Sequence, residues 1–189
     1  MNKKYLLKLQ EDLRLKNFTQ NTCDDYYRFV KRFLDFAGKE AISITYADIR
    51  KFIFYMKDNE LKKVSTINVY TAAIRFFFEY TLGYVWDPKK IPKMKRDRQL
   101  PVILTREQVN ALIDSIDNYK HKAITSTMYS WGLRVSEVCH LRYEDIRRSQ
   151  KMIHVPLSKN RQERYTILSD RNLEILTEYW YRFNRPLQT

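Results

Sequence analysis

The chain has 189 residues, and its 35 Lys and Arg against 22 Asp and Glu give it a formal charge of +13 at pH 7. Its 44% hydrophobic residues, with only three Gly and five Pro, exclude collagen-like and low-complexity classes and allow one domain or two small ones. Because no apolar run approaches the roughly 18 residues of a membrane-spanning helix, we expect a soluble, cytoplasmic protein without a membrane partner or secretory signal.

Four amphipathic helices are predicted in residues 1–86, since apolar residues recur there at helical spacing. The first runs through residues 5–13, and the second begins after a Thr19 cap and stops at Gly38. A capping box at residues 45–48 starts the third helix. Ser65 is the expected cap of the fourth, which ends at Gly83. The first half of the chain is therefore expected to be a purely helical domain.

Residues 87–101 form a basic segment that three prolines keep from being helical, and we interpret it as an interdomain linker. Within it, the six cations of residues 89–98 face a single acid, Asp97. Either the segment lies as a strap along a phosphate backbone or it is a solvated linker, and the single sign of its charge favours the strap. The cations are Lys89, Lys90, Lys93, Lys95, Arg96 and Arg98.

Residues 102–189 are predicted to form a second, mixed domain. A capping box at residues 105–108 starts a helix, and another helix ends at Trp131 before Gly132. Residues 152–155 and 164–168 alternate as in a β-hairpin, and Ser169 or Asp170 caps a last helix. The residues of the first helix expected to face the interior are Val109, Leu112, Ile113 and Ile116, and the last helix runs through Leu173, Ile175, Leu176, Tyr179 and Trp180. Apolar area is expected to stay exposed in this domain, at the surfaces of Trp131 and Trp180 among others.

Residues 132–146 carry a specific motif, in which Gly-Leu-Arg is followed by Ser-Glu, Leu-Arg and Asp-Ile. This motif resembles the first catalytic box of the tyrosine recombinases, the phage-integrase family. The hairpin resembles the lysine-bearing β-turn of that family, and the helical first half resembles its core-binding domain. The resemblance covers nearly the whole chain. It implies a mainly α protein, with a four-helix SAM-like core-binding domain (1–86), a linker (87–101) and part of an α+β catalytic domain (102–189).

The resemblance also implies roles for three residues. Arg134 would hold the scissile phosphate, because a permanently charged planar fork suits phosphate oxygens. Lys159 would act as general acid on the departing 5′ oxygen, and Glu137, one helical turn after Arg134, would orient that arginine. Taken singly, Arg134 and Glu137 also fit an ordinary surface pair, and Lys159 a solvated turn lysine.

The sequence departs from the family after the hairpin. The family requires a His-x-x-Arg box and then a nucleophilic tyrosine, but none of the three histidines is followed by Arg at the third position. We therefore expect a truncated catalytic domain with no nucleophile, and we interpret Tyr179 and Tyr181 as helix-packing residues. Cys23 and Cys139 match no metal spacing, and no phosphate-cradling glycine loop is present. No metal or nucleotide cofactor is expected.

Duplex DNA is the expected partner, with other recombinase protomers on that DNA as further candidates. The start of the fourth helix combines ammonium groups with hydroxyls and free amides, where a phosphate would fit. Alternatively, Ser65 is only a cap and the lysines are a solvated face. The predicted DNA contacts are Lys62, Lys63, Ser65, Thr66, Asn68 and Arg75, with Lys93, Lys95, Arg96 and Arg98 in the linker and Arg161 and Arg164 in the hairpin.

Three functions remain open at this point. The parent family integrates and recombines DNA by phosphotyrosine strand exchange, and this chain would be a fragment that binds DNA without cutting it. A second hypothesis is an enzyme assembled in trans, in which another protomer supplies the second arginine and the tyrosine. A third is a non-enzymatic regulator that competes with a full-length recombinase at its sites.

Overall fold

The computed structural model describes residues 2–96, 100–156 and 163–183. The chain divides into two compact units, residues 1–100 and residues 101–189, and each is described by itself. Among the described residues, no helix is both long enough and apolar enough to cross a membrane.

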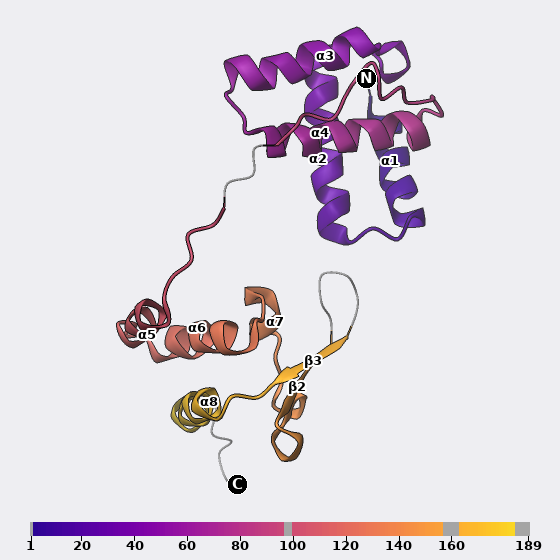
Figure 1. Ribbon diagram of the computed structural model, residues 1–189. Helices are drawn as coiled ribbons and strands as arrows, with labels where there is room; N and C mark the ends of the chain where they lie inside the picture. Colours follow the sequence, from indigo (N-terminus) through magenta and orange to yellow (C-terminus); the bar gives the residue numbers. More distant parts are fainter. Residues whose placement is uncertain (1, 97–99, 157–162, 184–189) are drawn as a thin grey trace. The chain divides into compact units, whose positions relative to one another are not determined.

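The first unit is made of four helices (Figure 1), as the sequence predicts. Helix α2 packs against both α1 and α4, and it also contacts α3. Helices α3 and α4 each continue into a π-helical turn, over Tyr55–Asn59 and Phe77–Thr81 respectively. The bounds are α1 Lys3–Leu15, α2 Gln20–Ala37, α3 Tyr46–Phe54 and α4 Val64–Phe76, with a short 3-10 turn at Ala41–Ser43.

The core of the first unit is aromatic, and it extends past the fourth helix. Phe33, Phe52 and Phe77 are fully buried among the apolar faces of α2, α3 and the end of α4. Trp86 and Ile91 are buried in the same core, and Met94 packs against it. The beginning of the basic segment therefore lies against the first unit rather than free of it.

Caps and glycines set the ends of these helices. Thr19 caps α2, Gly38 ends it in the left-handed conformation, and Thr45 forms a capping box with Asp48, all as predicted. The predicted cap at Ser65 is wrong, because α4 begins at Val64 with Lys63 as N-cap. The Lys63 carbonyl accepts the amides of Thr66 and Ile67, so Ser65 lies inside the first turn.

The described residues of the second unit form four helices and a small sheet. The helices are α5 Arg106–Asp114, α6 Tyr119–Trp131, α7 Val135–Cys139 and α8 Asp170–Phe183. The antiparallel sheet has the order β1-β2-β3, with β1 Ile146–Arg147, β2 Met152–Val155 and β3 Arg164–Ile167. The hairpin β2–β3 was predicted, whereas the two-residue strand β1 was too short to leave a pattern. Short 3-10 turns at Tyr143–Asp145 and Arg148–Gln150 flank β1.

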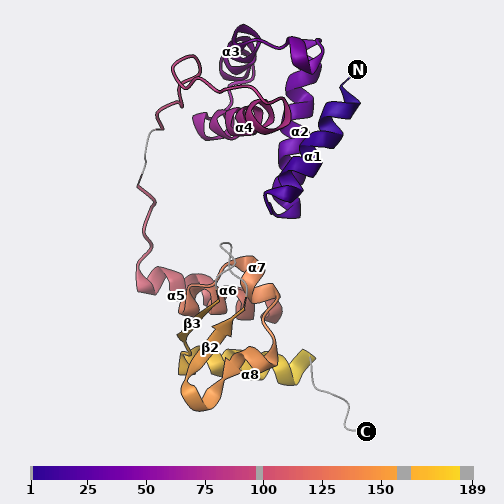
Figure 2. The same ribbon diagram turned by 90° about the vertical axis from the view of Figure 1, so that its right-hand side faces the viewer.

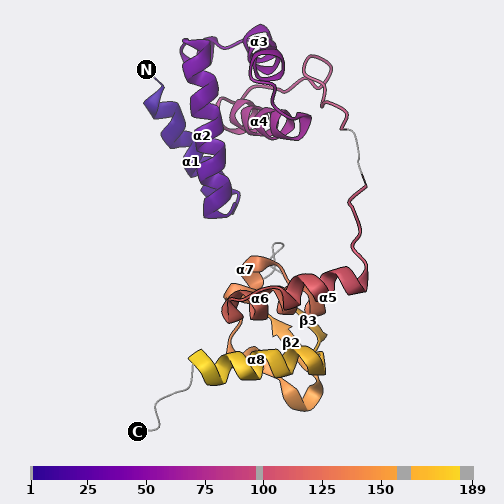
Figure 3. The ribbon, with the colours of Figure 1, turned by 90° about the vertical axis from the view of Figure 1, so that its left-hand side faces the viewer.

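The core of the second unit joins the sheet to α6 and α8. Figures 2 and 3 show α8 from the side, below α6, and these two helices are in contact. The buried cluster comprises Trp131, Leu133, Ile153, Val155 and Leu168, and Leu173 and Leu176 of α8 pack against it. This core is much smaller than that of the first unit.

One predicted inward position is wrong in the second unit. Leu112 is 52% exposed, and Ile113 is the one α5 residue in the core of the described structure. Trp131 is buried, against expectation, whereas Trp180 is 37% exposed and lies beside Tyr143 at the surface, with ring centroids 5.5 Å apart. The helical spacing identified the helices correctly, but the small core does not cover their whole apolar stripes.

Candidate functional site

The candidate site is built where α6 gives way to α7. Gly132 ends α6 with φ +62, a left-handed conformation that suits glycine, and Leu133 turns into the core. Arg134 is the N-cap of α7, and its backbone amide donates to Glu137 Oε2 at 2.9 Å. The turn therefore fixes the backbone of Arg134 one helical turn before the carboxylate of Glu137.

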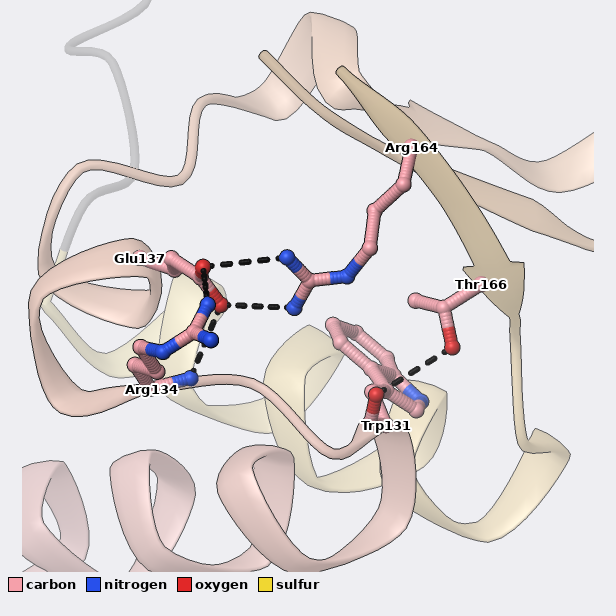
Figure 4. Close-up of polar contacts among 5 residues, drawn as sticks. All are labelled: Trp131, Arg134, Glu137, Arg164 and Thr166. Carbon is pink, nitrogen blue, oxygen red and sulfur yellow. Dashed lines mark hydrogen bonds and ion pairs between the residues drawn. The ribbon is translucent and has the colours of Figure 1, made fainter. Parts of the chain in front are cut away.

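Glu137 is the centre of the site (Figure 4). Its side chain is only 3% exposed, and it accepts Nη1 of Arg134 at 2.7 Å. Arg164, from β3, donates Nη1 to Oε1 at 3.0 Å and Nη2 to Oε2 at 2.7 Å. The Arg164 hydrogen bonds, and then those from Arg134, lower the pKa of Glu137 to about 2 against the opposing effect of burial. The carboxylate is therefore ionised at neutral pH.

Arg134 presents the remainder of its guanidinium to solvent. Its side chain is 54% exposed, and one of its nitrogens is engaged with Glu137. A guanidinium offers five donors in a planar fork, so most of them remain for an external acceptor. A phosphate is the acceptor that this geometry fits best, because its oxygens match the fork and carry opposite charge.

Strand β3 is tied to the same turn at a second point. Thr166 Oγ1 donates to the carbonyl oxygen of Trp131 at 3.1 Å (Figure 4). Arg164 and Thr166 are two residues apart in a strand, so both side chains lie on one face. The strand is in register with β2, where Val155 pairs with Arg164 and Ile153 with Thr166. The hairpin is thus attached to the loop that carries Arg134.

The structure brings the predicted site residues Arg134 and Glu137 together, with 2.7 Å between Nη1 and Oε1. Arg164 was predicted as a DNA contact, and the structure instead places it on the carboxylate of Glu137. No sequence signal pointed to that pairing, since 27 residues separate the partners. Lys159, Arg161 and Arg98 lie outside the described residues.

The start of α4 carries exposed cations. Lys62, Lys63 and Ser65 are exposed, and Thr66 is half-buried. An ion pair between Arg32 and Glu60, with a hydrogen bond from Arg32 Nη1 to Tyr70 Oη at 2.9 Å, holds the preceding turn to α2 and α4. This turn carries Lys62 and Lys63 at the surface, where a phosphate would reach them.

Two other predicted DNA contacts on α4 have protein partners. Asn68 is 8% exposed. Its side-chain Nδ2 donates to the backbone carbonyl of Met94 at 3.0 Å, and its Oδ1 accepts the backbone amide of Met94 at 3.1 Å. Its side chain is therefore occupied in fastening the basic segment to α4, which does not favour a DNA role. Arg75 forms a bidentate pair with Glu79, at 3.0 and 3.1 Å.

The remaining linker cations, Lys93, Lys95 and Arg96, are exposed. They follow the buried Ile91 and flank Met94, so the attachment through Asn68 keeps them at the surface of the first unit. The residues that the structure describes contain no group of three or more His, Cys, Asp or Glu side chains that could hold a metal ion.

A groove of about 400 Å³ with a mixed polar and apolar lining lies in the second unit between α6, α7 and α8. Val138, Leu141 and Leu176 contribute to its lining, and Tyr143 and Trp180 stand among the residues around it. The small core of this unit is therefore open on the side where these three helices meet.

Comparisons with known proteins agree with this architecture. The profile of the phage integrase family matches residues 103–184, and that of the phage integrase N-terminal SAM-like domain matches residues 5–87. The integrase/recombinase y4qK of Sinorhizobium fredii is 35% identical over 95% of this chain and 58% of its own length. The integrase/recombinase y4eF of the same organism is 36% identical over 74% of this chain and 55% of its own length. The chain thus spans somewhat more than half the length of these relatives.

Among solved structures, the Tn1549 transposon integrase, in complex with transposon right end DNA, is similar over 94% of this chain and 65% of that chain. The TM-score is 0.67 at 15% sequence identity. A likeness at this identity shows a shared fold, mainly helical with a SAM-like first domain and a small antiparallel sheet in the second.

Proposed function

Because the chain belongs to the phage integrase family of tyrosine recombinases, we propose that it binds duplex DNA and holds a backbone phosphate with Arg134. The observation that carries this proposal is the half-exposed guanidinium of Arg134, which the buried carboxylate of Glu137 holds by an ion pair on its inner side. Phosphodiester transfer without a metal needs fixed cations directed at the phosphate oxygens, where charge develops. Arg134 has the charge, the geometry and the access for that task.

Lys159 is proposed as the general acid of the parent reaction, by its place in the lysine-bearing hairpin. An ammonium group can donate a proton to a departing 5′ oxygen, whereas a guanidinium keeps its protons at any physiological pH. Arg134 would then bind the phosphate while Lys159 supplies the proton. The attachment of β3 to the turn at residues 131–137 supports this pairing of roles.

The cations of the first unit are proposed to bind the DNA backbone without reading sequence. Lys62 and Lys63 lie at the start of α4, and Lys93, Lys95 and Arg96 follow the segment that Asn68 fastens. Contacts of this kind give affinity that falls with salt, because each neutralised phosphate releases counterions. The formal charge of +13 supports this type of binding.

By itself, this sequence is proposed to bind DNA without cutting it. It contains no His-x-x-Arg box, so the second arginine and the nucleophilic tyrosine of the family have no matching positions. The same observation favours a second candidate function, that of a regulator that occupies recombination sites and excludes a full-length recombinase. Competition between the two proteins for one duplex distinguishes regulation from inert binding.

The test is a fluorescence-anisotropy titration of a labelled 30-base-pair duplex at several salt concentrations. We expect Arg134→Ala to weaken binding several-fold and to reduce the slope of log affinity against log salt by about 1, as for one lost phosphate contact. Arg182→Ala is the matched control, since it also removes one guanidinium, from an ion pair with Glu178 on α8. Equal losses in both variants would refute the role of Arg134, because net charge alone would then explain them.

A further inference from the structure

We propose that Arg164 is a positioning residue, which keeps Arg134 available to phosphate by occupying the carboxylate of Glu137. This inference rests on the proposed role of Arg134 and assigns Arg164 a task other than the direct DNA contact that its charge indicates.

The donors divide unequally between the two arginines. Both terminal nitrogens of Arg164 donate to Glu137, one to each carboxylate oxygen, at 3.0 and 2.7 Å. Arg134 donates one terminal nitrogen to Oε1 and its backbone amide to Oε2. Arg164 is therefore the bidentate side-chain partner, and among the described residues the other donors of the Arg134 guanidinium have no partner (Figure 4).

The charges lead to the same conclusion. Two guanidinium groups around one carboxylate leave the cluster with a net charge of about +1, by simple addition of unit charges. Without Arg164, Arg134 would be the one side-chain partner of Glu137 among the described residues, and that pair would be neutral. A bidentate pair with Glu137 would also use the donors that the phosphate needs. Arg164 thus maintains both the positive field and the free donors of Arg134.

The backbone explains why Arg164 holds the inner place. It lies on a strand that is in register with β2, and Thr166 on the same face bonds to the carbonyl of Trp131. Its side chain is 34% exposed, compared with 54% for Arg134. The strand delivers the guanidinium of Arg164 to the buried carboxylate, whereas Arg134 reaches it from the solvent side.

A double-mutant cycle in the DNA titration tests this inference. We expect Arg164→Ala to weaken duplex binding several-fold when Arg134 is present, but to change it less than about 1.5-fold in the Arg134→Ala background. Arg164→Lys keeps a cation beside Glu137 and should recover part of the affinity that Arg164→Ala loses. If Arg164→Ala weakens binding equally in both backgrounds, Arg164 contacts DNA directly and the inference is wrong.

A second measurement covers variants that bind DNA weakly or lose stability. The side-chain Nε–Hε signal of Arg134 is followed by NMR during a titration with inorganic phosphate, with circular dichroism confirming that each variant is folded. We expect phosphate to shift this signal in the wild type and in Arg164→Lys, and to shift it several-fold less in Arg164→Ala. An equal shift in Arg164→Ala would overturn the inference, whereas no shift in the wild type would overturn both it and the proposed role of Arg134.

Discussion

Glu137 is a carboxylate that two guanidinium groups share, and its ionisation couples the turn at Arg134 to the strand at Arg164. The side chain is nearly inaccessible, so an unpaired charge there would be costly, and both arginines are needed to satisfy it. The hydrogen bonds from Arg164 and Arg134 lower its pKa from 4.5 to about 2. The geometry of the site therefore depends on this residue staying ionised.

The lowered pKa gives Glu137→Gln a pH-dependent effect on stability. A carboxyl group with a depressed folded-state pKa stabilises the protein above its unfolded pKa near 4.5, and this contribution is lost as the pH falls through about 2. We expect Glu137→Gln to cost about 2 kcal/mol at pH 7, since water around the half-exposed Arg134 screens part of the effect. Urea unfolding of both proteins between pH 7 and pH 2 measures it.

The difference between wild type and Glu137→Gln should narrow steadily between pH 4.5 and pH 2. Glu144→Gln is the control, because the carboxylate of Glu144 is 71% exposed in its pair with Arg142. That variant should change stability by less than about 1 kcal/mol, as for surface pairs. A difference that is independent of pH for Glu137→Gln would contradict the assigned ionisation.

At the residue scale, local pairs were predictable and distant ones were not. Arg134 and Glu137 are three residues apart at the start of a helix, so their contact follows from helical spacing. The partners of Asn68 and Arg164 lie 26 and 27 residues away. Composition and spacing carry no information on such contacts, and both side chains were assigned to DNA because they are polar or charged.

At the element scale, helix ends were the most predictable features of the fold. Thr19, Thr45 and Thr105 cap their helices through side-chain hydrogen bonds, because Thr oxygens accept the free amides of a first turn. Gly38 and Gly132 end α2 and α6 with the same φ of +62. Strand β1 and the start of α4 at Val64 were not predicted. Pairing with β2 defines β1, and no local sequence signal marks either feature.

The two glycines provide a matched pair of substitutions for separating stability from site geometry. A Cβ at either position would meet nothing within 4 Å, so alanine costs only backbone strain, about 1 kcal/mol or more in the left-handed region. We expect Gly132→Ala and Gly38→Ala to lower stability by similar amounts in urea unfolding. Gly132→Ala should in addition weaken duplex binding several-fold, because it shifts the turn that presents Arg134.

Gly38→Ala should leave duplex binding within about twofold of wild type under conditions in which the protein is folded, since Gly38 ends a helix in the other unit. If both variants bind as tightly as the wild type, the conformation of the turn at Gly132 does not control the site. Anisotropy titrations at one salt concentration suffice for this comparison.

At the scale of the whole molecule, the two units differ in how fully they bury their apolar surface. The first has an extensive aromatic core that includes Trp86 and Ile91, whereas the second has a five-residue buried cluster beside a groove of about 400 Å³. The chain spans 58% of y4qK and 55% of y4eF. Residues 132–146 resemble the first catalytic box of the family, and none of the three histidines of the given sequence begins a His-x-x-Arg motif.

The central proposal is that this 189-residue sequence binds DNA through a cationic site without cutting it. The most direct measurement incubates it with a nicked suicide duplex carrying the DNA that flanks its gene, and compares native and denaturing gels over a range of salt. We predict a complex on native gels that weakens as salt rises, and no covalent adduct on denaturing gels. An adduct that survives denaturation would contradict the claim, because it would show that a tyrosine of this chain attacks the phosphate.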